Sequence, residues 1–259
     1  FSCLRLCQFC CAGCLRNNKI FFYFFFRFLC LVLRLFLAEE VLPYIDQLMA
    51  MPSSELARVL IEGLPARIDT LTAYLRNEYY ALYPLYNFYF TRDAAVTIGN
   101  QALICRMANK VRMRESLIMD AIYRYSGAFE CSVVDANAGE QDSSEIIMEG
   151  GDIIIAREDI LIVGNGVRTT PQGIDFIVDR LCCCNPEARM NVIVQQLPSQ
   201  PESFIHLDMV FTLLDKDKCM IFKPLIMRAN QYQTVHIVIE GGKVSSIRPV
   251  GLSRNSEQN

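Results

Sequence analysis

Five charged or titratable residues stand in short polar segments between apolar runs, and their side chains could together handle a flat cation. They are Asp93, Glu149, Arg168, His206 and Asp208. Carboxylates hold a planar guanidinium by paired hydrogen bonds, arginines bind a carboxylate, and a neutral imidazole moves a proton. The set therefore favours a site that binds and transforms an amino acid carrying a guanidinium group.

The elements that must position these residues form a repeated pattern of two strands, a helix and a strand. The apolar runs and turn residues predict strands at 94–98, 102–105 and 131–134 with a helix at 112–125, then strands at 153–156, 160–163 and 192–196 with a helix after Thr170, and a third pair of strands at 209–213 and 219–222. An acid begins the first strand of each copy. Such units cannot each bury an apolar face alone, so we expect them to assemble around a centre where the acids meet.

The chain as a whole fits one large domain or two small ones. It has 259 residues, a net charge of -3 and 52% hydrophobic residues, which argues against disorder and gives no reason to expect nucleic-acid binding. Twelve cysteines are present, six of them before residue 31. Their irregular spacing and apolar surroundings favour neither a disulfide framework nor a metal site.

Residues 1–38 differ from the rest of the chain. They contain no acid, and the stretch 20–37 is nearly apolar and about long enough to span a membrane. Arg27 and Arg34 cancel most of the insertion energy, so a membrane anchor is marginal. The segment could instead be a signal peptide or no part of the functional protein. We expect a cytoplasmic protein, or one associated with a membrane through residues 20–37.

From residue 39 onward the pattern predicts a helical subdomain at 39–82, an α/β catalytic domain at 83–251 and a polar tail at 252–259. Apolar residues at spacings of three and four indicate a helix that begins after Glu40, and Pro52 and Ser53 start a second helix that ends near Gly63.

Five motifs resemble the arginine deiminase family of guanidino-group-modifying enzymes. They are Asn87-x-x-Phe90-x-x-Asp93, Arg112-x-x-Glu115, Glu149-Gly-Gly-Asp152, Gly166-x-Arg168-Thr169 and His206-x-Asp208. The resemblance covers roughly residues 39–250. It implies a five-bladed α/β-propeller, the pentein fold, with a helical insertion. It also implies cofactor-free hydrolysis of L-arginine to L-citrulline and ammonia, with no metal and no nucleic-acid partner.

The resemblance assigns four residues to catalysis. Asp93 and Asp208 would hold the guanidinium nitrogens, and His206, oriented by Glu149, would act as general acid and base.

Four further residues would bind the substrate. Arg112, Arg168 and Asn87 would hold its α-carboxylate, and Phe90 would pack against its aliphatic stem.

The chain departs from the family in one respect. The family's nucleophile is a cysteine in a Gly-rich segment near the C-terminus, and no cysteine follows Cys219 here. About three of five blades are recognisable, so we expect an incomplete propeller with open strand edges, possible homo-oligomers and negligible turnover. The alternatives are a non-catalytic arginine-binding pseudoenzyme, or a related dimethylarginine hydrolase or amidinotransferase.

Overall fold

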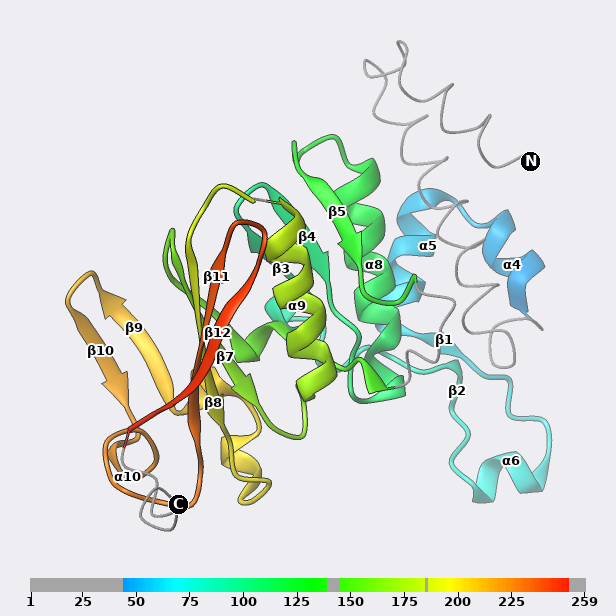
Figure 1. Ribbon diagram of the computed structural model, residues 1–259. Coiled ribbons are helices and arrows are strands. Elements are labelled where there is room, and N and C mark those ends of the chain that lie inside the picture. Colours follow the sequence, from blue (N-terminus) through cyan, green and yellow to red (C-terminus); the bar gives the residue numbers. More distant parts are fainter. Residues whose placement is uncertain (1–43, 139–144, 185, 252–259) are drawn as a thin grey trace. The chain divides into compact units, whose positions relative to one another are not determined.

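The computed structural model describes residues 44–138, 145–184 and 186–251 (Figure 1). Two compact units are distinguished. Of the described residues, the first unit contains 44–89 and Arg114–Val133, and the second contains Phe90–Met113 and those from Val134 onward. The expected extension at 1–38, including the apolar stretch 20–37 and its cysteines, and the expected tail at 252–259 lie outside the described residues.

The first unit is helical, as predicted for the region after residue 39. Its elements are the helices α4 (Ile45–Ala50), α5 (Ser53–Glu62) and α6 (Leu71–Leu75), the short strands β1 (Leu64–Pro65) and β2 (Tyr80–Leu82), and most of the helix α8 (Met113–Tyr125). Gly63 ends α5 with a φ of 90°, a conformation that glycine adopts without strain. Ser53 is the first residue of α5 and provides no side-chain cap.

Helix α8 completes the core of this unit. Leu117 and Ile118 of α8 belong to one buried cluster that also contains Leu48 of α4 and Leu56 and Leu60 of α5. The apolar spacing correctly predicts the helix itself. Its membership of the first unit was not expected, because the sequence places it inside the first α/β repeat. The expected boundaries at residues 38, 82 and 251 stay predictions.

The second unit is built on β-sheets. Its strands are β3 (Ala95–Ile98), β4 (Gln101–Ile104), β6 (Ile153–Arg157), β7 (Ile160–Asn165), β8 (Met190–Gln196), β9 (Phe211–Asp215), β10 (Lys218–Ile221), β11 (Thr234–Glu240) and β12 (Lys243–Val250), and β5 (Ser132–Asp135) contains the boundary between the units. The large sheet has the order β12-β11-β8-β7-β6, with β7 and β8 parallel and the other neighbours antiparallel. A second sheet has the order β3-β4-β5, and β9 pairs with β10.

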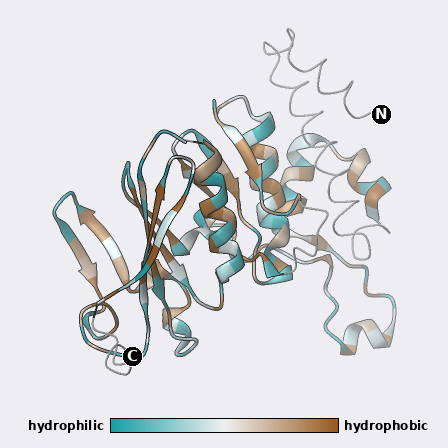
Figure 2. Ribbon diagram, viewed as in Figure 1, coloured by the Kyte–Doolittle hydropathy of each residue, from teal (hydrophilic) through white to brown (hydrophobic). Residues whose placement is uncertain are grey.

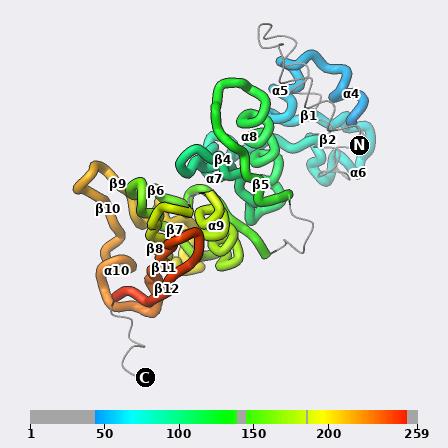
Figure 3. Tube along the Cα trace, turned by 45° about the horizontal axis from the view of Figure 1, so that its top comes forward, coloured from blue at the N-terminus to red at the C-terminus, as the bar shows by residue number. Residues whose placement is uncertain are grey.

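Helix α9 (Pro171–Cys184) packs against β7, β11 and β12 of the large sheet. Its buried residues include Ile174, Ile177 and Val178, which is the face that the apolar spacing predicts. Figure 2 shows hydrophobic colour along the central strands of this sheet, whereas the tip of the β9–β10 hairpin is hydrophilic. This hairpin projects beyond the large sheet in the views of Figures 1 and 3.

A short helical turn directly precedes each of the hairpins β3–β4, β6–β7 and β9–β10. The turns are α7 (Thr91–Ala94) before β3, η4 (Gly150–Asp152) before β6 and η6 (Leu207–Met209) before β9. The sequence pattern predicts an acid at the start of the first strand of each copy, but Asp93, Asp152 and Asp208 lie in these turns instead. Alternation along a strand predicts that His206 and Asp208 lie on one face. This prediction is wrong, because Asp208 lies in the helical turn η6.

The mixed α/β class is confirmed, while the propeller arrangement stays a prediction. The remaining short helices are η2 (Lys110–Arg112), η5 (Glu202–Phe204) and α10 (Lys223–Ile226). Within the part of the chain that the structure describes, every helix is too short or too polar to cross a membrane.

Candidate active site

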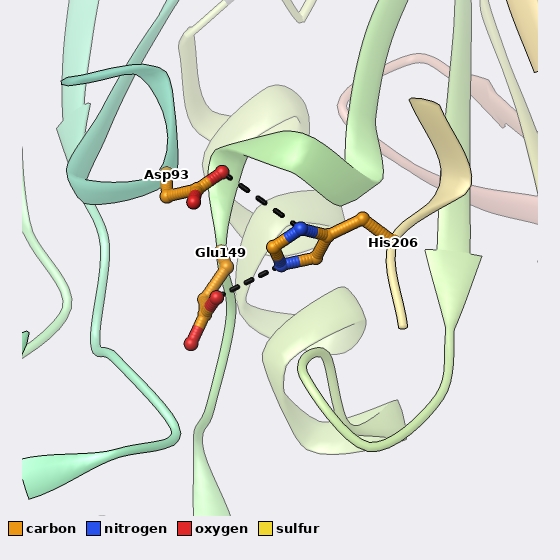
Figure 4. Close-up of side chains that lie close together, drawn as sticks. All are labelled: Asp93, Glu149 and His206. Atoms are coloured by element: carbon orange, nitrogen blue, oxygen red, sulfur yellow. Dashed lines mark hydrogen bonds and ion pairs between the residues drawn. The ribbon is translucent and has the colours of Figure 1, made fainter. Parts of the chain in front are cut away.

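The second unit brings Asp93, Glu149 and His206 together from three separate segments. The imidazole Nε2 of His206 lies 2.8 Å from Glu149 Oε2, and its Nδ1 lies 4.0 Å from Asp93 Oδ1. Figure 4 shows the ring between the two carboxylates. All three residues are buried. The imidazole is therefore held at one nitrogen, and its other nitrogen faces a second acid.

Two arginines neutralise these carboxylates. Arg112 Nη1 lies 2.9 Å from Asp93 Oδ2 and 3.6 Å from Glu149 Oε2. Arg168 Nη1 lies 3.3 Å from Glu149 Oε1, and the side chain of Arg168 is 25% exposed, whereas Arg112 is buried. Because an unpaired buried charge is costly, this pairing explains how two acids can be tolerated in the interior.

The backbone of the Glu-Gly-Gly-Asp motif approaches the other residues closely. A Cβ added to Gly151 would lie 2.8 Å from Asp93 Oδ1 and 2.9 Å from the His206 ring, and a Cβ on Gly150 would meet the backbone of Arg92. Glu149 Oε1 also accepts a hydrogen bond from the Ala108 N–H at 3.0 Å. Glycine is thus required here because a larger residue would separate the acids from the imidazole.

The remaining predicted site residues are less closely connected. Asp208 is half-buried in η6 and interacts electrostatically with His206, Arg92 and Asp93. Phe90 is 49% exposed in the second unit. Asn87 is exposed and belongs to the first unit, so its expected part in the site stays a prediction.

The sequence is similar to one known family over most of its length. The family model described as arginine deiminase matches residues 56–252, which is more than half of the chain. The chain belongs to the arginine deiminase family. The arginine deiminase of Listeria welshimeri is 30% identical over 218 residues, which cover 82% of this chain and 52% of that protein. The arginine deiminase of Listeria monocytogenes serotype 4b is 31% identical over 184 residues, which cover 68% of this chain and 44% of that protein.

This member of the arginine deiminase family spans about half the length of the curated relatives it matches. Among solved structures, DDAH from Pseudomonas aeruginosa in complex with citrulline overlaps with a TM-score of 0.42 at 19% identity, covering 63% of this chain and 65% of that one. The N-terminal domain of ArgZ, a cyanobacterial arginine dihydrolase, bound to product, gives a TM-score of 0.41 at 22% identity, covering 52% and 44%. The family assignment depends on the sequence matches alone.

Hydrogen bonding and charge shift the pKa values of Glu149 and His206 in opposite directions. Burial alone would raise the pKa of Glu149, but the hydrogen bond from His206 and the charge of Arg168 outweigh it and lower that pKa. Burial alone would lower the pKa of His206, but the bond to Glu149 and the charges of Asp152 and Asp93 raise it. Since the Glu149 carboxylate is ionised, the imidazole Nε2–H is the donor.

Two other acids are shifted in the opposite direction from Glu149. Burial raises the pKa of Asp152 to about 7, although Thr169, His206 and the Leu207 N–H act against it. Burial also raises the pKa of Asp208, with Asp93 adding to the effect. The site therefore contains acids with different proton affinities, an arrangement common where protons are moved.

The shifts of Glu149 and His206 by themselves favour the folded state most between about pH 4.5 and 6.5, whereas the raised pKa values of Asp152 and Asp208 lower the free energy of unfolding as the pH rises above about 3.8. The pKa of His206 in the folded protein lies above 6.5. The stability that its proton contributes is therefore lost as the pH rises through this folded-state pKa. The pKa of Glu149 lies below 4.5, so its contribution is lost as the pH falls through it. Urea unfolding across this range measures the curve. His206→Gln should flatten part of the fall above pH 6.5, whereas His236→Gln should leave it unchanged; equal curves for both variants would refute the assignment.

Sequence reasoning missed some residues around this cluster. Arg92 donates from Nε to the Gly150 carbonyl at 3.1 Å and from Nη2 to the Ile153 carbonyl at 2.5 Å. Cys105 is buried and interacts electrostatically with Glu149, Asp93 and Asp152. The sequence contains no signal for either contact, because the partners of Arg92 are backbone atoms about 60 positions away.

Asp93, Glu149 and His206 also offer ligand atoms that lie within 4.8 Å of one another. Carboxylate oxygens and imidazole nitrogens are common ligands of divalent transition metals. In this structure Arg112 and Arg168 already supply positive charge to the two carboxylates. The two carboxylates thus already have positively charged partners within the protein.

Proposed function

We propose that this chain binds L-arginine at the cluster of Asp93, Glu149 and His206, as an arginine deiminase-like hydrolase. The observation that carries the proposal is the buried His206–Glu149 contact beside Asp93, with Arg112 and Arg168 on the same acids. Carboxylates next to a proton-transferring imidazole suit a cationic planar substrate, and arginines suit its carboxylate. The proposed overall reaction converts L-arginine and water to L-citrulline and ammonia.

The proposed binding of substrate requires one rearrangement. Asp93 Oδ2 is held by Arg112 at 2.9 Å, so a substrate guanidinium that pairs with Asp93 must replace the guanidinium of Arg112. The freed Arg112 would then bind the substrate α-carboxylate together with Arg168. The binding energy of arginine thus includes an exchange of one guanidinium for another at the same carboxylate.

The proposed chemistry assigns proton transfer to His206. Where a cysteine thiolate is supplied as nucleophile, its attack on the guanidinium carbon forms a C–S bond, and the C–N bond breaks as His206 gives its proton to departing ammonia. His206 then takes a proton from water, whose oxygen attacks the same carbon, and the C–S bond breaks to release citrulline and the thiolate. Glu149 would hold the ring at Nε2 through both steps, which leaves the Nδ1 side toward Asp93 as the side that meets the substrate.

Two of the described cysteines, Cys105 and Cys182, are poorly suited to be this nucleophile. Cys105 lies nearest in electrostatic terms, and burial together with Glu149 and Asp93 raises its thiol pKa, so it remains a neutral thiol. Cys182 lies at the end of α9, and the pKa of its thiol is raised by desolvation. We propose that the chain with this sequence binds arginine without appreciable turnover.

Calorimetry and a citrulline assay on the same preparation test this proposal. We expect saturable binding of L-arginine with a Kd in the millimolar range or below, and no citrulline above the level of a protein-free sample. N-methylated arginine in the same titration separates the dimethylarginine hydrolase alternative, because it should bind more weakly than arginine. Absence of binding to the folded chain would reject the arginine site, and rapid citrulline formation would reject the lack of turnover.

Arg168 should distinguish arginine from its decarboxylated analogue. Arg168→Met removes a partner of the α-carboxylate, so the Kd of L-arginine should rise about 10- to 100-fold, the equivalent of roughly 1.5–3 kcal/mol. The Kd of agmatine, which lacks the carboxylate, should change less than about threefold. Arg157→Met, an exposed arginine of β6, is the matched control. Equal losses for both ligands would mean that Arg168 does not contact the carboxylate.

A further inference from the structure

We propose that Asp152 is a positioning residue, which fixes His206 and Arg168 around Glu149 by holding the chain next to each of them. This role rests on the proposed function, whereas the hydrogen bonds of Asp152 that support it do not depend on that function. Asp152 is the last residue of the Glu-Gly-Gly-Asp motif and is fully buried. It follows Glu149 by three residues. The structure shows hydrogen bonds to its carboxylate from Leu207 and Thr169, and none from the imidazole or from the Arg168 guanidinium.

Each oxygen of Asp152 holds a neighbour of a site residue. Oδ1 accepts a hydrogen bond from the Leu207 N–H at 2.8 Å, and Leu207 directly follows His206. Oδ2 accepts one from the Thr169 hydroxyl at 2.7 Å, and Thr169 directly follows Arg168. The Asp152 carboxylate therefore joins the segment that carries His206 to the segment that carries Arg168.

Thr169 extends this connection to Glu149 itself. The Thr169 Oγ1 atom accepts a hydrogen bond from the Glu149 N–H at 3.3 Å, and Thr169 is fully buried. Asp152, Thr169 and the backbone of Glu149 thus form a continuous chain of bonds under the cluster. The side-chain contacts above it, His206 to Glu149 and Arg168 to Glu149, need these three segments in a fixed register.

The surroundings are shaped for a carboxylate at this position. Gly164 of β7 would place a Cβ 2.5 Å from Asp152 Oδ1, so a side chain there would collide with the acid. The Leu207 N–H and the Thr169 hydroxyl each donate to Asp152, and a carboxylate offers an acceptor oxygen to both of them. Burial raises the pKa of this acid to about 7, which is a cost that an apolar residue would avoid.

Histidine NMR gives a readout that a purely structural role would not move. The chain contains only two histidines, and His236, bonded to Asn191 Oδ1 at 3.0 Å on β11, is an internal control. We expect the hydrogen-bonded Nε2–H signal of His206 in the natural chain and in Asp152→Asn, whose amide oxygen still accepts from the Leu207 N–H while its NH2 group donates to the Thr169 hydroxyl, which can turn to accept. Asp152→Ala should lose that signal and shift the pKa of His206, while the His236 signals stay in place.

Two results would overturn the inference. A folded Asp152→Ala variant that keeps the His206 signal would show that the acid positions nothing. Loss of the signal in Asp152→Asn as complete as in Asp152→Ala would assign the effect to charge and not to position.

Thr169→Val decides the question if Asp152→Ala does not fold. It should accelerate exchange of the Glu149 amide proton at least about tenfold, the equivalent of one lost hydrogen bond, and leave the His206 signal. An unchanged exchange rate would overturn the inference. Failure of L-arginine to bind the natural chain, with the histidine and exchange results as expected, would reject the proposed function alone.

Discussion

Replacement of Glu149 by Gln is expected to lower the free energy of unfolding by about 3–5 kcal/mol. Glu149 is fully buried and lies within 3.6 Å of nitrogens of Arg112, Arg168 and His206. The neutral amide would leave Arg112 and His206 facing Asp93 and would remove the carboxylate that pairs with Arg168. An uncompensated charge in the interior costs far more than the loss of one ordinary hydrogen bond, so the effect should be large.

Urea unfolding followed by far-UV circular dichroism measures this loss, because the chain contains no tryptophan for fluorescence. Glu158→Gln, an exposed acid in the turn between β6 and β7, is the matched control and should change the midpoint little. The charge network would be unsupported if the two variants unfolded at the same urea concentration. The pKa of His206 should also fall in Glu149→Gln, because its strongest raising influence is gone.

Asp93→Asn is expected to weaken L-arginine binding by roughly 30-fold to several thousand-fold, the equivalent of about 2–5 kcal/mol. Asp93 is buried at α7, and its two oxygens face Arg112 and His206. In the proposed complex the same carboxylate holds the substrate guanidinium, so its removal takes away a charge-assisted pair that cannot be replaced by water.

Calorimetry with L-arginine tests the role of Asp93 when combined with an unfolding curve of the variant. Asp217→Asn, in the exposed turn between β9 and β10, provides a control of equal size and charge. Unchanged affinity in a folded Asp93→Asn protein would place the guanidinium elsewhere. Guanidinium ion alone, used as a second probe, should lose affinity in parallel with arginine, because it has no carboxylate to bind Arg168.

The elements of the fold could be predicted well from local patterns. The hairpins β3–β4 and β6–β7 follow from β-branched runs separated by turn residues, and α9 follows from Pro171 and the spacing of Ile174 and Ile177. The turn around Asp208 could not be predicted in this way. Leu207, Met209 and Val210 look like the start of a strand, yet Leu207 and Val210 are buried by a helical turn before β9 begins.

The site could be predicted only in part. The motifs named Asp93, Glu149, Arg168 and His206, and the structure places all four in one cluster. However, His206 and Glu149 are 57 positions apart, and no local rule gives such a contact. The pairing of Arg112 with Asp93 and the support from Thr169 and Asp152 were missed, because they depend on how three turns pack beneath the cluster.

The most direct test is a titration of the histidine-labelled chain with L-arginine, followed by NMR. The account predicts that the imidazole signals of His206 move saturably, with the same Kd as calorimetry, because a guanidinium enters beside Asp93. The His236 signals should remain in place. Unmoved His206 signals in a folded chain, at arginine concentrations up to roughly ten times a millimolar Kd, would contradict the account.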